Sequence, residues 1–180
     1  MRIIQMTPLA KARLWVSGTA TSGVALTDPI SGSFVAARSG APEHPAVTVE
    51  ALVPRGPLAE YGLLGFAYQS TASGNLCIEV GHSASDGSRW DRSLASAIDD
   101  VRLGLPEEYS HAIFQALSSA VGTKLGPGVL RLAEAAHGAI GSSPNFFARL
   151  SSAAAELMFI DMADASDDLL VKLLRRILVG

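Results

Sequence analysis

The sequence predicts an α+β fold in one compact domain. Short β-leaning segments separated by Gly, Ser and Pro fill the first half of the chain, and amphipathic helix patterns with capping residues fill much of the second half. A length of 180 residues suits a single hydrophobic core. Apolar residues make up 48% of the chain and charged residues only 17%, and these proportions indicate a folded protein.

Residues 1–45 form the first group of expected strands. The pieces RIIQM, ARLWVSG, GVALTD and SFVAARSG are separated by Gly and Ser every six to ten residues, which predicts a hairpin or meander. We treat this region as a β-rich extension. Its pattern leaves open whether it adds strands to the main sheet or forms a separate arm.

Three further strands are expected, in residues 46–53, 61–70 and 74–82. The first alternates apolar and polar residues, and the other two are rich in β-branched or aromatic residues between Gly or Pro. The polar segment 83–93 predicts a loop. Residues 94–104 fit either a helical turn or a strand, and residues 128–138 fit either a strand or a helix.

Helix signals dominate the second half of the chain. Pro106 stands where the first turn of a helix accepts it, because its missing N–H would have no partner there. Two glutamates follow near the positive end of the helix dipole, and apolar residues recur at three-to-four spacing until Gly122. Ser143 and Pro144 repeat this kind of start for a second helix within residues 142–160.

A third helix is expected at the C-terminus, in residues 161–180. Ser166 would cap it, with acidic residues at its positive end and two arginines near its negative end. Its apolar face is broad, so the helix either closes the core or pairs with a second copy of the chain as a homodimer. The residues expected at such an interface are Leu170, Leu173, Leu174 and Ile177.

The net charge and the cysteine content limit which partners and which cellular compartment can be expected. A net charge of −3 argues against broad, charge-driven binding to nucleic acid, but it is compatible with a local basic patch. The single cysteine, Cys77, lies in an apolar segment and is expected to be a buried thiol in a reducing compartment. No segment reaches the ~20 apolar residues that span a bilayer, and none has the core of a signal peptide. We therefore expect a cytoplasmic protein with no membrane partner.

Short motifs occur in a fixed order between residues 46 and 158. The first, Tyr61-Gly62, leads into a strand. The second opens a helix with Pro106, Glu108, Tyr109, Ala112 and Ile113. The third spans a strand, a loop and a helix with Arg131, Leu132, His137, Ser142, Ser143, Phe147 and Leu150. In this order the motifs resemble domain IV of translation elongation factor G, which has the ribosomal protein S5 domain 2-like fold. The resemblance implies a β-α-β sandwich with a mixed sheet and two or three helices packed on one face, with residues 46–160 as its core.

The resemblance also implies a binding surface. In that family the tips of domain IV reach the decoding region of the ribosome, so RNA or the ribosome is the implied partner. Arginine would bind phosphate, tyrosine or histidine would stack on bases, and hydroxyls would bind sugar or phosphate. The implied positions are Arg55, Gly56, Tyr61, Gly62, His137, Ser142 and Ser143.

The same residues also have purely structural interpretations. Tyr61 can shape the entry to a strand, Ser143 can cap a helix, and His137 can be a solvated loop residue. The basic, glycine-rich tip loop of the family is reduced here to Arg55 and Gly56. No Gly-x-x-x-x-Gly-Lys-Ser/Thr phosphate loop occurs in the chain, so we expect no GTP binding.

Signals for catalysis and cofactors are weak. The four histidines lie far apart in sequence, and neither HExxH nor paired Cys-x-x-Cys spacing occurs, so we expect no metal and no other cofactor. The stretch GHSAS (81–85) departs from the Gly-x-Ser-x-Gly nucleophile elbow at its last position. The leading hypothesis is a stand-alone, non-GTPase binding module for RNA or the ribosome. The alternatives are a protein-interaction or oligomeric module that reuses the fold, and a small enzyme of unknown reaction.

Overall fold

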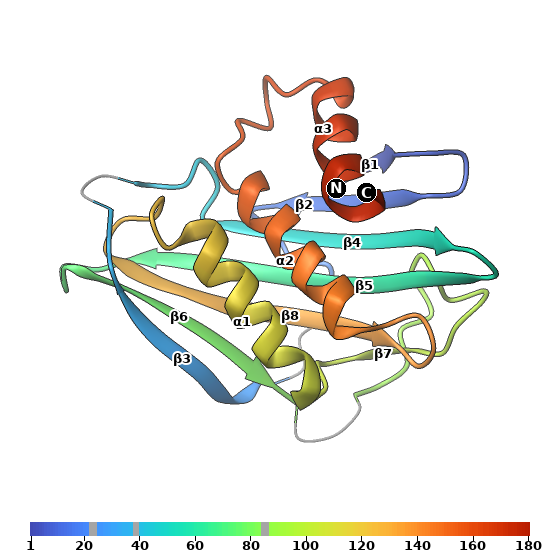
Figure 1. Ribbon diagram of the computed structural model, residues 1–180, viewed down its shortest axis with the longest axis horizontal. Helices are drawn as coiled ribbons and strands as arrows, with labels where there is room; N and C mark the ends of the chain where they lie inside the picture. The colour runs from blue at the N-terminus through green and yellow to red at the C-terminus, as the bar shows by residue number, and fades with distance from the viewer. Residues whose placement is uncertain (22–24, 38–39, 84–86) are drawn as a thin grey trace.

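The computed structural model describes residues 1–21, 25–37, 40–83 and 87–180. Within these residues the chain forms an α+β structure with a mixed sheet, as predicted, and this sheet has eight strands (Figure 1). The strands run in the order β1-β2-β4-β5-β8-β6-β3, and β7 pairs with the end of β8. The strands are β1 (Arg2–Gln5), β2 (Lys11–Val16), β3 (Thr27–Val35), β4 (Ala46–Arg55), β5 (Leu58–Ser70), β6 (Asn75–His82), β7 (Val101–Leu103) and β8 (Gly128–Gly138).

The strand pairing shows where each sequence segment lies in the sheet. Paired strands are antiparallel except β6 and β8, which are parallel. The β1–β2 hairpin pairs with β4, whereas β3 lies at the opposite edge and pairs with β6. Residues 1–45 therefore add strands to both edges of the sheet. The three strands expected between residues 46 and 82 are β4, β5 and β6.

The two edge strands differ in length and regularity. β1 has only four residues. β3 has nine, but its register with β6 shifts between Thr27 and Ile30, where Pro29 lacks a backbone N–H. β3 is therefore irregular at its start and regular from Ile30 to Val35.

The described part of the chain has three α-helices: α1 (Glu107–Val121) lies between β7 and β8, and α2 (Pro144–Leu157) and α3 (Asp167–Leu174) come after β8. α3 continues into the π-helical segment η1 (Arg175–Val179). Figure 1 shows α1 and α2 side by side across one face of the sheet, with α3 near β1. Ser143 and Ser166 accept hydrogen bonds from the backbone N–H groups of Phe146 and Leu169, both at 3.2 Å, which confirms the two predicted caps. None of the helices in the described part of the chain is long and apolar enough to cross a membrane.

The segments that were ambiguous in sequence are now assigned. Residues 128–138 form β8, and residues 94–104 contain turns followed by the short strand β7. Of the predicted loop 83–93, residues 84–86 lie outside the described residues. In the remainder of that loop, Arg89 forms an isolated bridge to Arg102 of β7.

The main core lies between the sheet and the helices. It combines inward-facing side chains of β4, β5, β6 and β8 with the apolar faces of α1, α2 and α3. A smaller cluster lies on the opposite side of the sheet, which we call the back face. There Trp90 and Ala95, from the segment 88–100, cluster with Tyr61 and Leu63 of β5. This segment therefore covers part of the back face.

Glu134 is buried on the back face and is fully supplied with hydrogen-bond donors. Its carboxylate accepts hydrogen bonds from the backbone N–H groups of Ala20 and Thr21, at 3.0 and 2.9 Å. The hydroxyls of Thr21 and Thr48 also donate to it, at 2.8 and 2.6 Å. A buried charge is tolerated when such donors replace water. Glu134 thereby holds residues 20–21 against the sheet.

The C-terminal helix closes the main core. Leu170, Leu174 and Leu178 are fully buried within the chain. Of the two alternatives that the sequence leaves open, closure of the core therefore applies to Leu170 and Leu174, which have no exposed surface to offer a second copy. Leu173 and Ile177 are half-buried and pack against the same core. Leu169 differs from these residues because 48% of its surface is exposed.

Replacing Leu170 with alanine is expected to lower the free energy of unfolding by about 2–5 kcal/mol, because the substitution leaves a cavity at a fully buried position. The neighbouring Leu169→Ala substitution is the matched control. It should cost less than about 1 kcal/mol, because Leu169 is already half exposed. Urea denaturation measures both values, and equal losses would contradict this orientation of α3.

Candidate functional site

Three segments meet at one end of the sheet, which we call the tip. They are the β4–β5 turn at residues 55–58, the turn segment 95–99 and the loop 139–142 between β8 and α2 (Figure 1). A pocket of about 260 Å³ lies between them. Its apolar walls include Leu52, Leu58, Tyr61, Ala95, Ile98 and Ile140.

The β4–β5 turn is tight. Arg55 pairs with Leu58 across it, which leaves Gly56 and Pro57 as the two central residues. Gly56 has a φ of +61°, which would strain any other residue, and proline fixes φ at about −65°. A glycine with positive φ at the first central position is typical of a type II′ hairpin turn. The turn places Arg55 and Leu58 at the apex of the tip.

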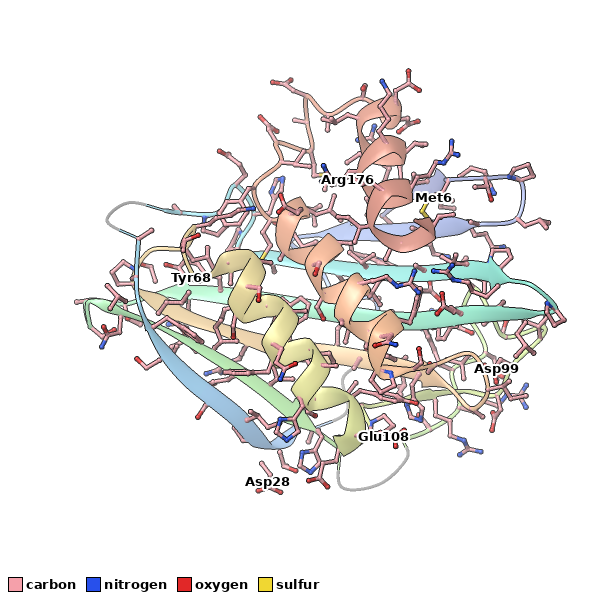
Figure 2. The ribbon with its side chains drawn as sticks, in the orientation of Figure 1. Met6, Asp28, Tyr68, Asp99, Glu108 and Arg176 are labelled. Carbon is pink, nitrogen blue, oxygen red and sulfur yellow. The ribbon has the colours of Figure 1, made fainter. Side chains whose placement is uncertain are left out.

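Asp99 fixes the loop 139–142 in place. Its carboxylate accepts hydrogen bonds from the backbone N–H groups of Ile140, at 3.1 Å, and Gly141, at 2.8 Å. The carbonyl of Gly141 accepts a hydrogen bond from the backbone N–H of Tyr61 at 2.8 Å, so the loop is also tied to β5. Figure 2 shows Asp99 at the same end of the sheet as the β4–β5 turn. The tip is therefore assembled by specific polar contacts between its segments.

Three large aliphatic side chains surround the pocket, and we call them the apolar rim. Leu58, Ile98 and Ile140 are 60%, 62% and 68% exposed, and each comes from a different segment of the tip. Single exposed apolar residues are common on protein surfaces, but a group of them around a hollow marks an interaction site. The apolar rim is therefore the feature of the tip that most needs a functional explanation.

The arginines nearest the β4–β5 turn are paired with a carboxylate. Glu60 accepts a hydrogen bond from Arg55 at 2.9 Å and lies 2.5 Å from Arg149. Arg149 also donates to the carbonyl of Leu178 in η1 and lies over the ring of Phe146. Because Arg55 forms an ion pair with Glu60, its positive charge is largely offset, and the described part of the turn does not present a dense positive field.

The structure brings the predicted RNA-facing residues of β4 and β5 to the tip but exposes only some of them. Tyr61 is fully buried, and Gly62 lies beneath α2, where an added Cβ would come within 3.1 Å of Leu150. Neither residue can contact RNA in this conformation. Arg55 and Gly56 are exposed at the turn.

His137 is buried in β8 rather than exposed in a loop. Its Nδ1 atom lies 3.1 Å from the carbonyl oxygen of Gly104, and its ring meets the ring of Tyr109 edge-on. Tyr109 also stacks on Phe147, with 4.9 Å between the ring centroids. Burial, followed by the nearby Glu108 charge, raises the pKa of Tyr109 to about 12. These contacts make His137 and Tyr109 part of the packed interior.

Ser142 and Ser143 hold the chain between β8 and α2. The Ser142 hydroxyl accepts a hydrogen bond from the backbone N–H of Gly138 and donates one to the carbonyl of Tyr61, both at 2.8 Å. Ser143 is the N-cap of α2. Both hydroxyls therefore make contacts within the chain that position the loop of the tip.

A buried polar cluster lies behind the wall of the pocket. The hydroxyl of Tyr61 donates to Glu50 Oε1 at 3.1 Å, and the backbone N–H of Leu94 donates to the same oxygen at 2.6 Å. Arg13 lies 3.3 Å from Glu50 Oε2. Burial raises the pKa of Glu50 above its usual 4.5, and it raises the pKa of Tyr61 well above its usual range. The cluster fixes the segment 88–100 over the back face, next to the pocket.

Other reactive groups do not assemble into a site. Among the residues that the structure describes, no three His, Cys, Asp or Glu side chains are placed to hold a metal ion. Cys77 is half-buried, and burial, followed by the Glu79 charge, raises the pKa of its thiol. A thiol with a raised pKa is a poor nucleophile near neutral pH. In the GHSAS stretch, Ala84 and Ser85 lie outside the described residues.

The apolar rim and Asp99 were not among the functional residues predicted from the sequence. Leu58, Ile98 and Ile140 each stand in a turn-like context, within GPLAE, SAIDD and GAIGS. A large aliphatic residue in a turn does not belong to the apolar repeat of a helix or a strand. This isolation is the feature of the sequence that could have predicted that the three side chains are exposed. Nothing in the sequence indicated that the three residues would surround one pocket.

No protein-family model, no curated protein and no solved structure matches the chain. The predicted order of strand, strand, strand, helix, strand and helix is present as β4, β5, β6, α1, β8 and α2, with β7 added before α1. The likeness to domain IV of elongation factor G stays a prediction.

Replacing Asp99 with alanine should lower the free energy of unfolding by about 1–3 kcal/mol, because two backbone N–H groups lose their acceptor. The matched control is Asp91→Ala, which removes a carboxylate that pairs with Arg89 at the surface and should cost less than about 1 kcal/mol. Urea denaturation gives the stabilities. Hydrogen exchange at the Ile140 amide should accelerate in the Asp99 variant alone, and unchanged exchange there would contradict the role of Asp99.

The raised pKa of Glu50 predicts a pH dependence with a definite sign. Above pH 4.5 and up to the raised pKa, the folded chain holds the Glu50 proton more tightly than the unfolded chain does. The contribution of Glu50 to the free energy of unfolding must therefore fall as pH rises through this window. The free energy of unfolding of the wild type minus that of Glu50→Gln, measured by urea denaturation from pH 4.5 upward, should therefore decrease as pH rises. An increase would mean that the hydrogen bond from Leu94 and the attraction to Arg13 outweigh burial.

Proposed function

We propose that the chain is a binding module that docks a partner protein through the pocket and the apolar rim at its tip. The observation that carries this proposal is the convergence of Leu58, Ile98 and Ile140 around one hollow while each remains more than half exposed. Burying these side chains against a partner would remove apolar surface from water, which is the main driving force for protein association.

The size and polarity of the pocket favour an amino-acid side chain as its occupant. Small-molecule and cofactor sites have volumes of about 300–1,000 Å³, and this pocket of about 260 Å³ falls below that range. Asp99 lines the pocket, but its carboxylate already accepts backbone hydrogen bonds from the adjacent loop. A large apolar side chain of a partner protein would fill the space without leaving a buried polar group unpaired.

RNA or the ribosome is the second candidate partner. The order of the elements and the exposed Arg55 at the apex of the hairpin support it, because both agree with the resemblance to domain IV of elongation factor G. The pairing of Arg55 with Glu60 and the net charge of −3 weigh against it. The two candidates differ in their expected response to salt, since phosphate contacts weaken as salt rises and apolar contacts do not.

The proposal is tested first by photo-crosslinking in cells that express the full chain. A crosslinking amino acid replaces Ile98 in the apolar rim, and the matched control carries it at Gln115, an exposed position on α1. Ribosomes and ribosomal subunits are tested in parallel by co-sedimentation at low and moderate salt. We expect a protein to be captured at position 98 and not at position 115.

Binding to the captured protein is then measured with purified variants. Leu58→Asp and Ile140→Asp should each weaken binding by at least ~10-fold, and salt should change it little. Arg55→Ala should have a smaller effect. Unchanged binding by both rim variants would overturn the proposal. Co-sedimentation with ribosomes that falls with salt and is lost in Arg55→Ala would establish the second candidate in its place.

A further inference from the structure

The outer side of the C-terminal helix carries a second surface, separate from the tip. Leu169, Lys172, Leu173 and Arg176 line a shallow groove of about 220 Å³ along α3 and η1. Their spacing puts them on one side of the helix, away from the buried Leu170 and Leu174. We call this side the outer stripe of α3.

The charges at the two ends of the outer stripe have opposite signs. Asp168 is exposed at the start of α3, and Arg175 and Arg176 are exposed at the far end. None of these three forms an ion pair with another residue that the structure describes, whereas Asp167 lies 2.6 Å from Arg2. The helix dipole accounts for the signs at each end. It does not account for the exposed leucine between them.

A stripe with an acidic end, an apolar middle and a basic end is complementary to itself when two copies pair antiparallel. A two-fold axis would bring Asp168 of one copy opposite Arg175 and Arg176 of the other. Leu173 of each copy would then lie near the axis, next to Leu169 of the other copy. Lys172 flanks them, and its aliphatic stem can cover apolar surface while its ammonium group stays in water.

We propose that the outer stripe of α3 binds a second copy of this chain as an antiparallel, two-fold symmetric helix pair. A contact built on one short helix from each copy is small, so the dimer is expected to be weak and to depend on concentration. The proposal does not rest on the function proposed for the tip. If both hold, each dimer presents two tips and can bind a partner with two sites more tightly than one copy can.

The experiment uses charge reversal in the full chain. Asp168→Arg places an arginine opposite Arg176 of the other copy, and Arg176→Glu places a glutamate opposite Asp168 of the other copy. Each variant alone would oppose like charges in a dimer of its own kind. A mixture of the two variants restores opposite charges at both ends of the pair, so it should dimerise where neither variant does alone.

Sedimentation equilibrium of the wild type, each variant and the equimolar mixture, from about 10 µM to about 1 mM, gives the dissociation constants. The control is Arg92→Glu, which carries the same charge change as Arg176→Glu at an exposed position outside α3. We expect it to dimerise as the wild type does. We expect at least a ~10-fold weaker dimer for each stripe variant and recovery in the mixture. Circular dichroism and melting temperature confirm that each variant is folded.

Each other outcome overturns the proposal in a defined way. A wild type that stays monomeric over the whole concentration range would exclude the dimer. Equal weakening by Arg92→Glu would mean that net charge, and not the outer stripe, controls association. Folded stripe variants that weaken the dimer without recovery in the mixture would exclude the antiparallel pairing. Dimerisation that changes with Leu58→Asp but not with the stripe variants would place the interface at the tip.

Discussion

The segments that cover the back face of the sheet are held there by hydrogen bonds to two buried carboxylates. Glu134 gathers donors from residues 20–21 and from Thr48, and Glu50 gathers donors from Tyr61 and Leu94. A carboxylate buried without such donors would cost more free energy than one side chain recovers by packing. The covering segments are therefore required by the charges beneath them. The helical face has no such requirement, because it is held by apolar packing.

This requirement explains why exposed aliphatic side chains gather around a pocket at one end of the sheet. Glu50 holds the segment 88–100 across the back face, and the continuation of that segment delivers Asp99 to the loop after β8. These polar contacts fix the backbone of the turn segment and of the loop after β8. Next to the exposed Arg55, they leave Leu58, Ile98 and Ile140 facing solvent on a fixed backbone. A rigid backbone under exposed side chains lowers the entropy lost on binding.

Local chemistry made much of the fold predictable, and long-range contacts made the site unpredictable. The starts of α2 and α3 follow from Ser143 and Ser166, because a cap acts within a few residues. The segment that forms β8 was ambiguous because its apolar pattern fits both a strand and a helix. Only pairing with neighbouring strands decides between them. Tyr61 was expected near a ligand, and it is buried because residues from a distant segment cover it. The inner and outer sides of α3 could not be separated, because both carry leucines and only packing decides which ones are covered.

The edges of the sheet bear on how copies of this chain behave when they are crowded. β1 offers only four residues to an incoming strand, and β3 interrupts its outer row with Pro29 and a shift of register. A foreign strand could pair with at most four residues at β1 and, at β3, would meet the irregularity before Ile30; short and irregular edges of this kind limit the growth of sheets into fibrils. Contacts between molecules are thereby left to side chains. Single substitutions can strengthen or weaken such contacts without risking irreversible aggregation.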